Sequence, residues 1–416
     1  MTNFEFRISN IKSINGNIMS GISNKQLFLN HVAQTSPEPI GIEMVKAEGI
    51  YLYDADGKKY IDAISGFSVA NIGHSNPKVV KAVQTQTAQY MHLIVYGEFI
   101  EQPQISYAKL LTDNLPSSLN CVYFTNSGTE ATEGAMKLAK RFTNRSKIIS
   151  FNKSYHGSTQ GALSVMGDEY WRNAFRPLLP DVFHFNYGSD EAINAIDNNT
   201  CCVIAETIQA EAGIIQPKKE WLQTIRKKCD EHGAILILDE IQAGFGRTGT
   251  LWAFEQFNIV PDILLLGKAL GGGMPLGAFI ADKKLMNLLT HDPVLGHITT
   301  FGGHPVSCAA GKAAFEVLLD GNFISSVKNK EQFLIDNIHH KKIKAIRSAG
   351  LWMAIEFDSF KTNHAVIQEC ISKGLITDWF LFAANCMRIA PPLITTENEL
   401  KDICRIVLES VADADF

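Results

Sequence analysis

Short apolar runs of strand length alternate along this chain with longer segments in which apolar residues recur at helical spacing. Four of the runs span residues 147–151, 201–206, 233–239 and 263–266, and a helical pattern over 221–231 precedes the third of them. Strands that alternate with helices form a parallel sheet with helices packed on its faces. The pattern therefore predicts an α/β fold with a mostly parallel central sheet, whose ligand lies beyond the carboxyl ends of the strands.

The flanking regions have other patterns. Residues 49–62 form two alternating runs around the turn dipeptide Asp56-Gly57, which predicts a β-hairpin. Residues 78–115 have helical spacing with a break around 95–97. The same criteria predict a helix over 305–319, a strand over 351–357 and a helix over 401–411.

Composition excludes several classes of protein. The 416 residues can form a large domain and a smaller one, and the 46% hydrophobic content is typical of a globular protein. With a net charge of -5 and no basic run, we expect no nucleic-acid partner. The chain contains no run of 18 apolar residues, so we expect no membrane span. The N-terminus lacks a signal pattern, and we therefore expect a cytoplasmic location. The eight cysteines show no CxxC spacing, and we expect neither disulfides nor a metal site.

The most informative chemistry lies at the ends of two apolar runs. One run ends in Asp239, and about thirty residues later the next ends in Gly267-Lys268, with glycines at 271–273. Alone, the lysine could equally be a surface residue that opens a glycine-rich turn. A phosphate-binding loop of the Walker type is excluded because Ala269 stands where it needs Ser or Thr.

Together, the acid and the lysine are what a pyridoxal phosphate enzyme needs. Lys268 would hold the cofactor aldehyde as a Schiff base. Asp239 would pair with the pyridine nitrogen and keep the ring protonated, so that it acts as an electron sink. These are the two catalytic residues that the sequence predicts.

A candidate phosphate site precedes them. Residues 121–131 are predicted to run from strand through turn to helix, with Ser127, Gly128 and Thr129 at the helix N-terminus. Free N–H groups and the helix dipole favour an anion there. Alone, the stretch could be an ordinary helix cap. With Lys268 and Asp239 present, we interpret it as the cradle of the cofactor phosphate.

The segments 239–249 and 267–273 resemble those of the class III aminotransferases of fold type I, and further blocks extend the match from about Gly49 to the C-terminus. The resemblance implies pyridoxal 5'-phosphate as cofactor and a homodimer. It also implies a large cofactor-binding domain over 61–305. A smaller α+β domain would combine the N-terminal segment 1–60 with the C-terminal segment 306–416.

The resemblance also implies roles for further residues. Tyr155 matches the position that stacks on the cofactor ring, and Glu206 would face the cofactor. His156 could act as a general base, but no metal or nucleophile spacing accompanies it, and we expect a positioning residue beside the cofactor or a buried core histidine. Gln242 would contact the ring hydroxyl. Thr300 would reach the cofactor phosphate of the partner subunit, so that the active site needs a dimer.

Three residues are candidates for substrate binding. Arg388 matches an arginine that binds a substrate carboxylate, and Glu211 matches a glutamate that pairs with it as a gate. Phe67 falls where ornithine aminotransferases are expected to carry a tyrosine. The alternatives are an exposed strand arginine, a solvated glutamate and an ordinary core phenylalanine.

The predicted function is transfer of an amino group from an amino acid to an oxo acid by a ping-pong mechanism. The resemblance points to an ω-amine donor such as ornithine, N-acetylornithine or 4-aminobutyrate, and to 2-oxoglutarate as acceptor. A decarboxylase or aminomutase of the same fold, or a non-enzymatic cofactor-binding protein, are the alternatives. A nicotinamide-dependent reductase is disfavoured because no G-x-G-x-x-G follows an early strand.

Overall fold

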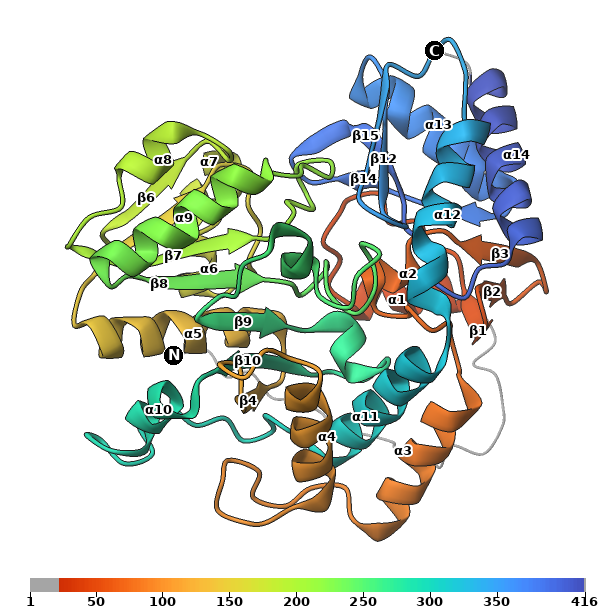
Figure 1. The fold of residues 1–416 in the computed structure, drawn as a ribbon. Coiled ribbons are helices and arrows are strands. Elements are labelled where there is room, and N and C mark those ends of the chain that lie inside the picture. The colour runs from red at the N-terminus through yellow and green to blue at the C-terminus, as the bar shows by residue number, and fades with distance from the viewer. Residues whose placement is uncertain (1–21, 415–416) are drawn as a thin grey trace, which may run out of the picture.

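The central element of the computed structural model, which describes residues 22–414, is a seven-stranded sheet (Figure 1). The strand order is β4 (Cys121–Thr125), β10 (Gly277–Ala281), β9 (Ile263–Leu266), β8 (Ile235–Asp239), β7 (Thr200–Glu206), β5 (Lys147–Phe151) and β6 (Val182–Phe185). The five strands from β9 to β6 are parallel, and β10 runs antiparallel to both of its neighbours. The predicted mostly parallel sheet is confirmed.

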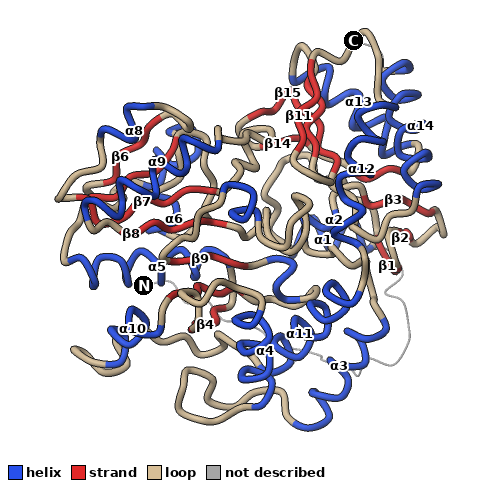
Figure 2. Tube along the Cα trace, in the orientation of Figure 1, coloured by secondary structure: helices blue, strands red, loops and turns tan. Residues whose placement is uncertain are grey.

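The sheet is buried on both faces, which explains why its inner strands are almost wholly apolar. Successive side chains of a strand point to opposite faces. Leu236 and Leu238 of β8 therefore share a cluster with α9 (Lys219–His232), while Ile235 and Ile237 share one with α5 (Gly128–Thr143). The two helices thus cover opposite faces of the sheet (Figure 2).

Two smaller sheets lie beside the large one. One has the order β1 (Met44–Glu48), β2 (Tyr51–Asp54), β3 (Lys59–Asp62) and β13 (Leu375–Ile376), and β2 and β3 form the predicted hairpin. The other has the order β11 (Ala345–Ser348), β12 (Met353–Glu356), β15 (Ala383–Ile389) and β14 (Trp379–Phe380). Because β13 pairs with β3, the N-terminal and C-terminal parts of the chain share a sheet (Figure 1).

Helices account for most of the remaining structure. The long ones are α3 (Pro77–Gln89), α4 (Gln102–Asp113), α11 (Pro305–Asp320), α12 (Phe323–Asn337), α13 (Phe360–Ser372) and α14 (Glu397–Asp413). The predicted break within 78–115 separates α3 from α4. Shorter helices are α1 (Asn24–His31), α2 (Ser65–Ser68), α6 (Gln160–Ser164), α7 (Glu169–Arg172), α8 (Asp190–Asn194) and α10 (Lys283–Met286). Short 3-10 turns are Asn173–Phe175, Ala253–Phe257, Lys268–Gly271 and Asn287–Thr290.

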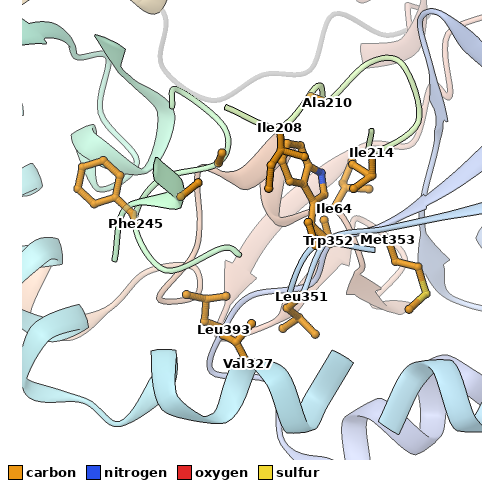
Figure 3. Close-up of a cluster of buried hydrophobic side chains, with 14 of the residues drawn as sticks. Ile64, Ile208, Ala210, Ile214, Phe245, Val327, Leu351, Trp352, Met353 and Leu393 are labelled. Carbon is orange, nitrogen blue, oxygen red and sulfur yellow. The ribbon is translucent and has the colours of Figure 1, made fainter. Parts of the chain in front are cut away.

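The loop that follows β7 is packed firmly against the smaller sheets. Ile208, Ala210 and Ile214 of this loop lie around Trp352, which directly precedes β12, with Ile64 beside them (Figure 3). All five side chains are buried. The core therefore fixes the loop that carries Glu211.

Some predictions are not tested by the fold. The domain boundaries 1–60, 61–305 and 306–416 stay predictions, and residues 1–21 of the first segment lie outside the described residues. In the described part of the chain, no helix is long and apolar enough to cross a membrane.

Candidate active site

Three neighbouring strands, β7, β8 and β9, carry their carboxyl ends to one cavity of about 310 Å³. Glu206 ends β7, Asp239 ends β8, and Lys268 follows β9 by two residues. The predicted site residues that line this cavity are Gly128, Thr129, Tyr155, His156, Glu206, Glu211, Asp239, Gln242 and Lys268. The described residues that line a larger cavity of about 580 Å³, between residues 66–84 and α11, include no lysine, arginine or carboxylate. We therefore place the chemistry in the smaller cavity.

Lys268 begins a 3-10 turn and has a left-handed backbone conformation with φ of 49°. Its side chain borders the cavity and is otherwise enclosed by protein. Burial lowers the pKa of Lys268 to about 8, although the nearby carboxylates of Glu211 and Asp239 oppose this change. A substantial fraction of this amine is therefore neutral near physiological pH, the form that can act as nucleophile or base.

The glycines after Lys268 permit close packing behind it. Gly272 has φ of 60°, and a Cβ atom there would lie 2.7 Å from the carbonyl oxygen of Ala310 in α11. Only glycine lets this turn lie directly on the helix. The glycine-rich segment thus sets the position of the lysine through backbone packing.

Asp239 is held on both carboxylate oxygens. Its Oδ1 accepts from the backbone N–H of Ile241 at 2.9 Å, and its Oδ2 lies 2.7 Å from Nδ1 of His156. His156 is buried, and its Nε2 has no hydrogen-bond partner among the described residues. The ring pairs with Asp239 at the cavity wall, and the positioning role of His156 stays a prediction.

The neighbouring acids have separate surroundings. The carboxylate of Glu206 accepts hydrogen bonds from the backbone N–H groups of Tyr155 at 3.1 Å and Ala210 at 2.8 Å. It therefore anchors the two loops that border the cavity. Burial, together with the charge of Asp239, raises the pKa of Glu206 well above its ordinary range. Glu240 points away from the cavity and accepts from Thr207 and from backbone N–H groups at the start of the 3-10 turn 253–257.

The N-terminus of α5 presents backbone to the cavity. Gly128 and Thr129 line it, and in the described structure their N–H groups have no protein acceptor. A Cβ atom on Gly128 would lie 2.6 Å from Cδ1 of Ile241, and one on Gly157 would lie 2.2 Å from Oγ1 of Thr129. Ser127 does not line the cavity; its hydroxyl caps the helix by accepting from the N–H of Glu130 at 3.4 Å.

Arg388 lies in β15 behind the cavity wall and is 1% exposed. Its Nη2 donates to both oxygens of Glu211, at 3.0 and 2.9 Å, and its Nη1 donates to Oε1 of Gln242 at 3.2 Å. Burial opposes ionisation of Glu211, but the charge of Arg388 holds the pKa of Glu211 below its ordinary value. The alternatives of an exposed arginine and a solvated glutamate are wrong, because both side chains are buried.

Sequence reasoning missed two neighbours of this arginine, Asp378 and Phe380. Oδ1 of Asp378 lies 3.1 Å from Nε of Arg388. The ring of Phe380 is also close, with its centroid 4.3 Å from Cζ of Arg388. Asp378 lies ten positions before Arg388, and the two come together only because the chain reverses between β14 and β15. No local motif in the sequence signals this approach.

Phe67 reaches Arg388 from a left-handed turn. Ser65, Gly66, Phe67 and Ser68 have φ between 51° and 64°, an unfavourable conformation for residues with side chains. Asp62 holds the turn by accepting from the N–H groups of Ile64 and Gly66, each at 3.0 Å. The ring of Phe67 is 44% exposed, with its centroid 5.2 Å from Cζ of Arg388, so the alternative of a core phenylalanine is wrong.

Thr300 is exposed and does not line the cavity of its own chain. It lies in the loop before α11, where the neighbouring Thr299 accepts from the side-chain amide of Asn126 at 2.8 Å. Its predicted contact with a partner subunit stays a prediction.

The residues around the cavity fit pyridoxal phosphate. A lysine with lowered pKa can hold its aldehyde, and a fixed carboxylate can face its ring nitrogen. The unpaired N–H groups of Gly128 and Thr129 can take up its phosphate. The lining thus provides a partner for each polar end of the cofactor.

The lowered pKa of Lys268 gives a prediction for the cofactor-free protein. Reaction with added pyridoxal phosphate should accelerate with rising pH through a midpoint near 8, because only the neutral amine attacks the aldehyde. The measurement is the rate at which the visible absorbance band of the bound cofactor appears, at a series of pH values. A midpoint near the ordinary lysine pKa of 10.5 would contradict the burial described above.

Comparison with known proteins agrees with this geometry. The sequence-family model "Aminotransferase class-III" matches residues 32–411. The acetylornithine aminotransferase of Methanopyrus kandleri is 37% identical over 376 residues, which cover 90% of this chain and 94% of that protein. The acetylornithine aminotransferase of Caldanaerobacter subterraneus subsp. tengcongensis is 35% identical, with 90% of this chain and 96% of that protein covered.

Solved structures show the same fold. An ornithine aminotransferase from Toxoplasma gondii superposes with a TM-score of 0.86 at 29% identity, over 93% of each chain. The adenosylmethionine-8-amino-7-oxononanoate aminotransferase of Methanocaldococcus jannaschii gives a TM-score of 0.87 at 28% identity, over 94% of this chain and 99% of that one. The chain therefore belongs to the class-III aminotransferases and is a transaminase that depends on pyridoxal phosphate.

Proposed function

We propose that this transaminase takes the amino group from the ω-amine of an N-acylated basic amino acid, with N-acetylornithine as the foremost candidate, and passes it to 2-oxoglutarate. The observation that carries the proposal is the buried pair of Arg388 and Glu211 at the wall of the cavity that contains Lys268. The acetylornithine aminotransferases at 35% and 37% identity support the choice of donor.

The pair gives the cavity two states. While Glu211 holds Arg388, the guanidinium is paired, and an ω-ammonium group can enter without repulsion from it. When Glu211 turns away, the guanidinium is free to bind the α-carboxylate of an oxo acid through two parallel hydrogen bonds. One cavity can then accept two substrates of different charge in turn.

The other residues act on the reacting groups. Bound pyridoxal phosphate supplies an electron sink for the carbon that carries the amine. Lys268 would hold the cofactor until the substrate amine displaces it, and the freed amine, in its neutral form, would move the proton from that carbon. Asp239, oriented by His156, holds the proton on the ring nitrogen. Tyr155 stacks on the ring, Gln242 contacts its hydroxyl, and Gly128 and Thr129 bind the phosphate.

Phe67 supports an acylated donor. Free ornithine brings a second ammonium group, which needs an acceptor where it comes to lie. Phe67 offers an apolar ring beside Arg388 and no hydroxyl. A neutral acylamide at that end of the donor needs no anionic or hydroxyl partner, so the ring favours it.

We also propose that the protein works as a homodimer in which Thr300 reaches the partner's site. Apolar side chains before α4 and before α11 are exposed, including Ile100 at 92%, Met91 at 64% and Phe301 at 52%. The two segments meet where the rings of His92 and Phe301 lie 4.8 Å apart. Exposed apolar surface of this kind is typical of subunit interfaces.

The eight free cysteines support a cytoplasmic location.

The main test follows the visible absorbance band of the holoenzyme. N-acetylornithine should bleach the band and 2-oxoglutarate should restore it, whereas K268A should show no such band and lose activity by about 10²–10⁴-fold. K284A, which removes an exposed lysine, is the matched control and should behave as the wild type. Bleaching that does not need Lys268, or release of carbon dioxide in place of an oxo product, would contradict the proposal.

The donor preference is tested at Phe67. F67Y adds a hydroxyl beside Arg388 and should raise the kcat/KM for ornithine relative to that for N-acetylornithine by about tenfold. F360Y adds the same hydroxyl to an exposed phenylalanine and should leave the ratio unchanged. An unchanged ratio in F67Y would mean that Phe67 does not select the donor.

The dimer is tested by charging its expected interface. The wild type should sediment at about twice the chain mass of 46.0 kDa, and the double variant I100E/F301E should sediment as a monomer with little activity. Y170E introduces a charge at another exposed ring, 86% exposed, and should stay dimeric and active. A monomeric wild type with full activity would rule out any need for Thr300 of a partner subunit.

A further inference from the structure

Arg388 is enclosed by two carboxylates, although the exchange of substrates requires only one to leave. Glu211 uses both of its oxygens on Nη2, the outer end of the guanidinium. Asp378 instead lies against Nε, the inner edge, at 3.1 Å. The two acids therefore occupy different donors of the same cation, and an incoming carboxylate at Nη2 competes with Glu211 and not with Asp378.

The two acids also differ in how they are attached. Asp378 and Arg388 lie on paired segments of one hairpin, where the N–H of Arg388 donates to the carbonyl oxygen of Asp378 at 2.8 Å. The hydroxyl of Thr377 donates to the carbonyl oxygen of Arg388 at 2.5 Å. Glu211 comes from the separate loop after β7. Asp378 consequently keeps its place beside Arg388 when the side chain of Glu211 moves.

The contact at Nε is close but not aligned. Within the described residues, neither Nε of Arg388 nor Oδ1 of Asp378 makes a hydrogen bond, although both atoms are buried. Buried polar atoms without partners are rare in proteins, because each one costs free energy. Nε of Arg388 and Oδ1 of Asp378 are therefore close enough to form a hydrogen bond, which they do not make while Arg388 pairs with Glu211.

We propose that Asp378 is a positioning residue that takes the Nε–H bond of Arg388 when Glu211 releases it, and so keeps the guanidinium aimed at the carboxylate of the oxo acid. This inference rests on the proposed exchange at Arg388. A buried guanidinium without a counterion is strongly unfavourable, and Asp378 prevents that state. Phe380 and Phe67, whose ring centroids lie 4.3 and 5.2 Å from Cζ, cover the cation during the exchange.

The sign of the effect follows from the geometry. The negative charge of Asp378 repels Glu211 and an incoming carboxylate about equally, because both occupy the same end of the guanidinium. This repulsion therefore makes no difference when the incoming carboxylate replaces Glu211. The hydrogen bond between Nε of Arg388 and Asp378 does make a difference, because it forms only after Glu211 has left. Removing Asp378 should weaken carboxylate binding, while removing the charge of Glu211 should strengthen it, because Glu211 is the competitor.

The test is calorimetric titration of the pyridoxal phosphate-loaded enzyme with glutarate, a dicarboxylate that cannot react. D378A should raise the Kd of glutarate by about tenfold, as expected for one charge-assisted hydrogen bond, and E211Q should lower it. D378N keeps an acceptor oxygen and should lie between D378A and the wild type. D230N is the matched control, because Arg226 also lies between two acids, Asp230 and Asp262, and it should bind as the wild type does.

The opposite signs make the result decisive. If D378A and D378N tighten glutarate binding as E211Q does, Asp378 is a second competitor and the proposal is overturned. Unchanged binding in folded D378A, or no binding in either the wild type or E211Q, overturns it as well. Failure of the proposed function has a different signature, because donor amines would then leave the absorbance band of the wild type unchanged.

Discussion

The cost of burying charge is the constraint on which the active site depends. Two cations, Lys268 at the carboxyl edge of the large sheet and Arg388 on β15 behind the cavity wall, are largely enclosed by protein. Neither could stay there without acids, and the chain supplies them from separate strands and loops. At Lys268, burial lowers the pKa more than the nearby acids raise it, so the pKa falls to about 8. The amine is then partly neutral near physiological pH and can react. At Arg388 the acids prevail, and the cation persists.

The sheet makes this arrangement possible because it brings distant residues to one edge. Parallel strands deliver their carboxyl ends to the same side, so Glu206, Asp239 and Lys268 meet although they span more than sixty positions of the chain. The apolar strands behind them are buried on both faces and hold these ends in place. Glu206 and Asp239 therefore lie at the ends of buried strands, and Lys268 lies two residues beyond one, whereas Glu211 comes from a loop.

The second wall of the site comes from the smaller sheets. Arg388 and Asp378 belong to a hairpin near the C-terminus, and Phe67 belongs to the left-handed turn that follows β3. Pairing of β3 with β13 joins these two regions. The side chain of Trp352 packs against the loop that carries Glu211, so apolar contacts hold this loop against the sheet that carries Arg388 (Figure 3).

The sequence by itself determined the buried strands β5, β7, β8 and β9, the hairpin within 49–62, and the meeting of Asp239 and Lys268 at one cavity, because burial patterns and strand-end chemistry are local properties. It did not predict β6, or the antiparallel position of β10 between β4 and β9. It could not decide that His156 pairs with Asp239, that Glu240 turns away, or that Phe67 sits in a left-handed turn. The role of Asp378 likewise depended on the tertiary structure. Each of these is a contact between segments that only the folded chain brings together, and spacing along the sequence carries no record of it.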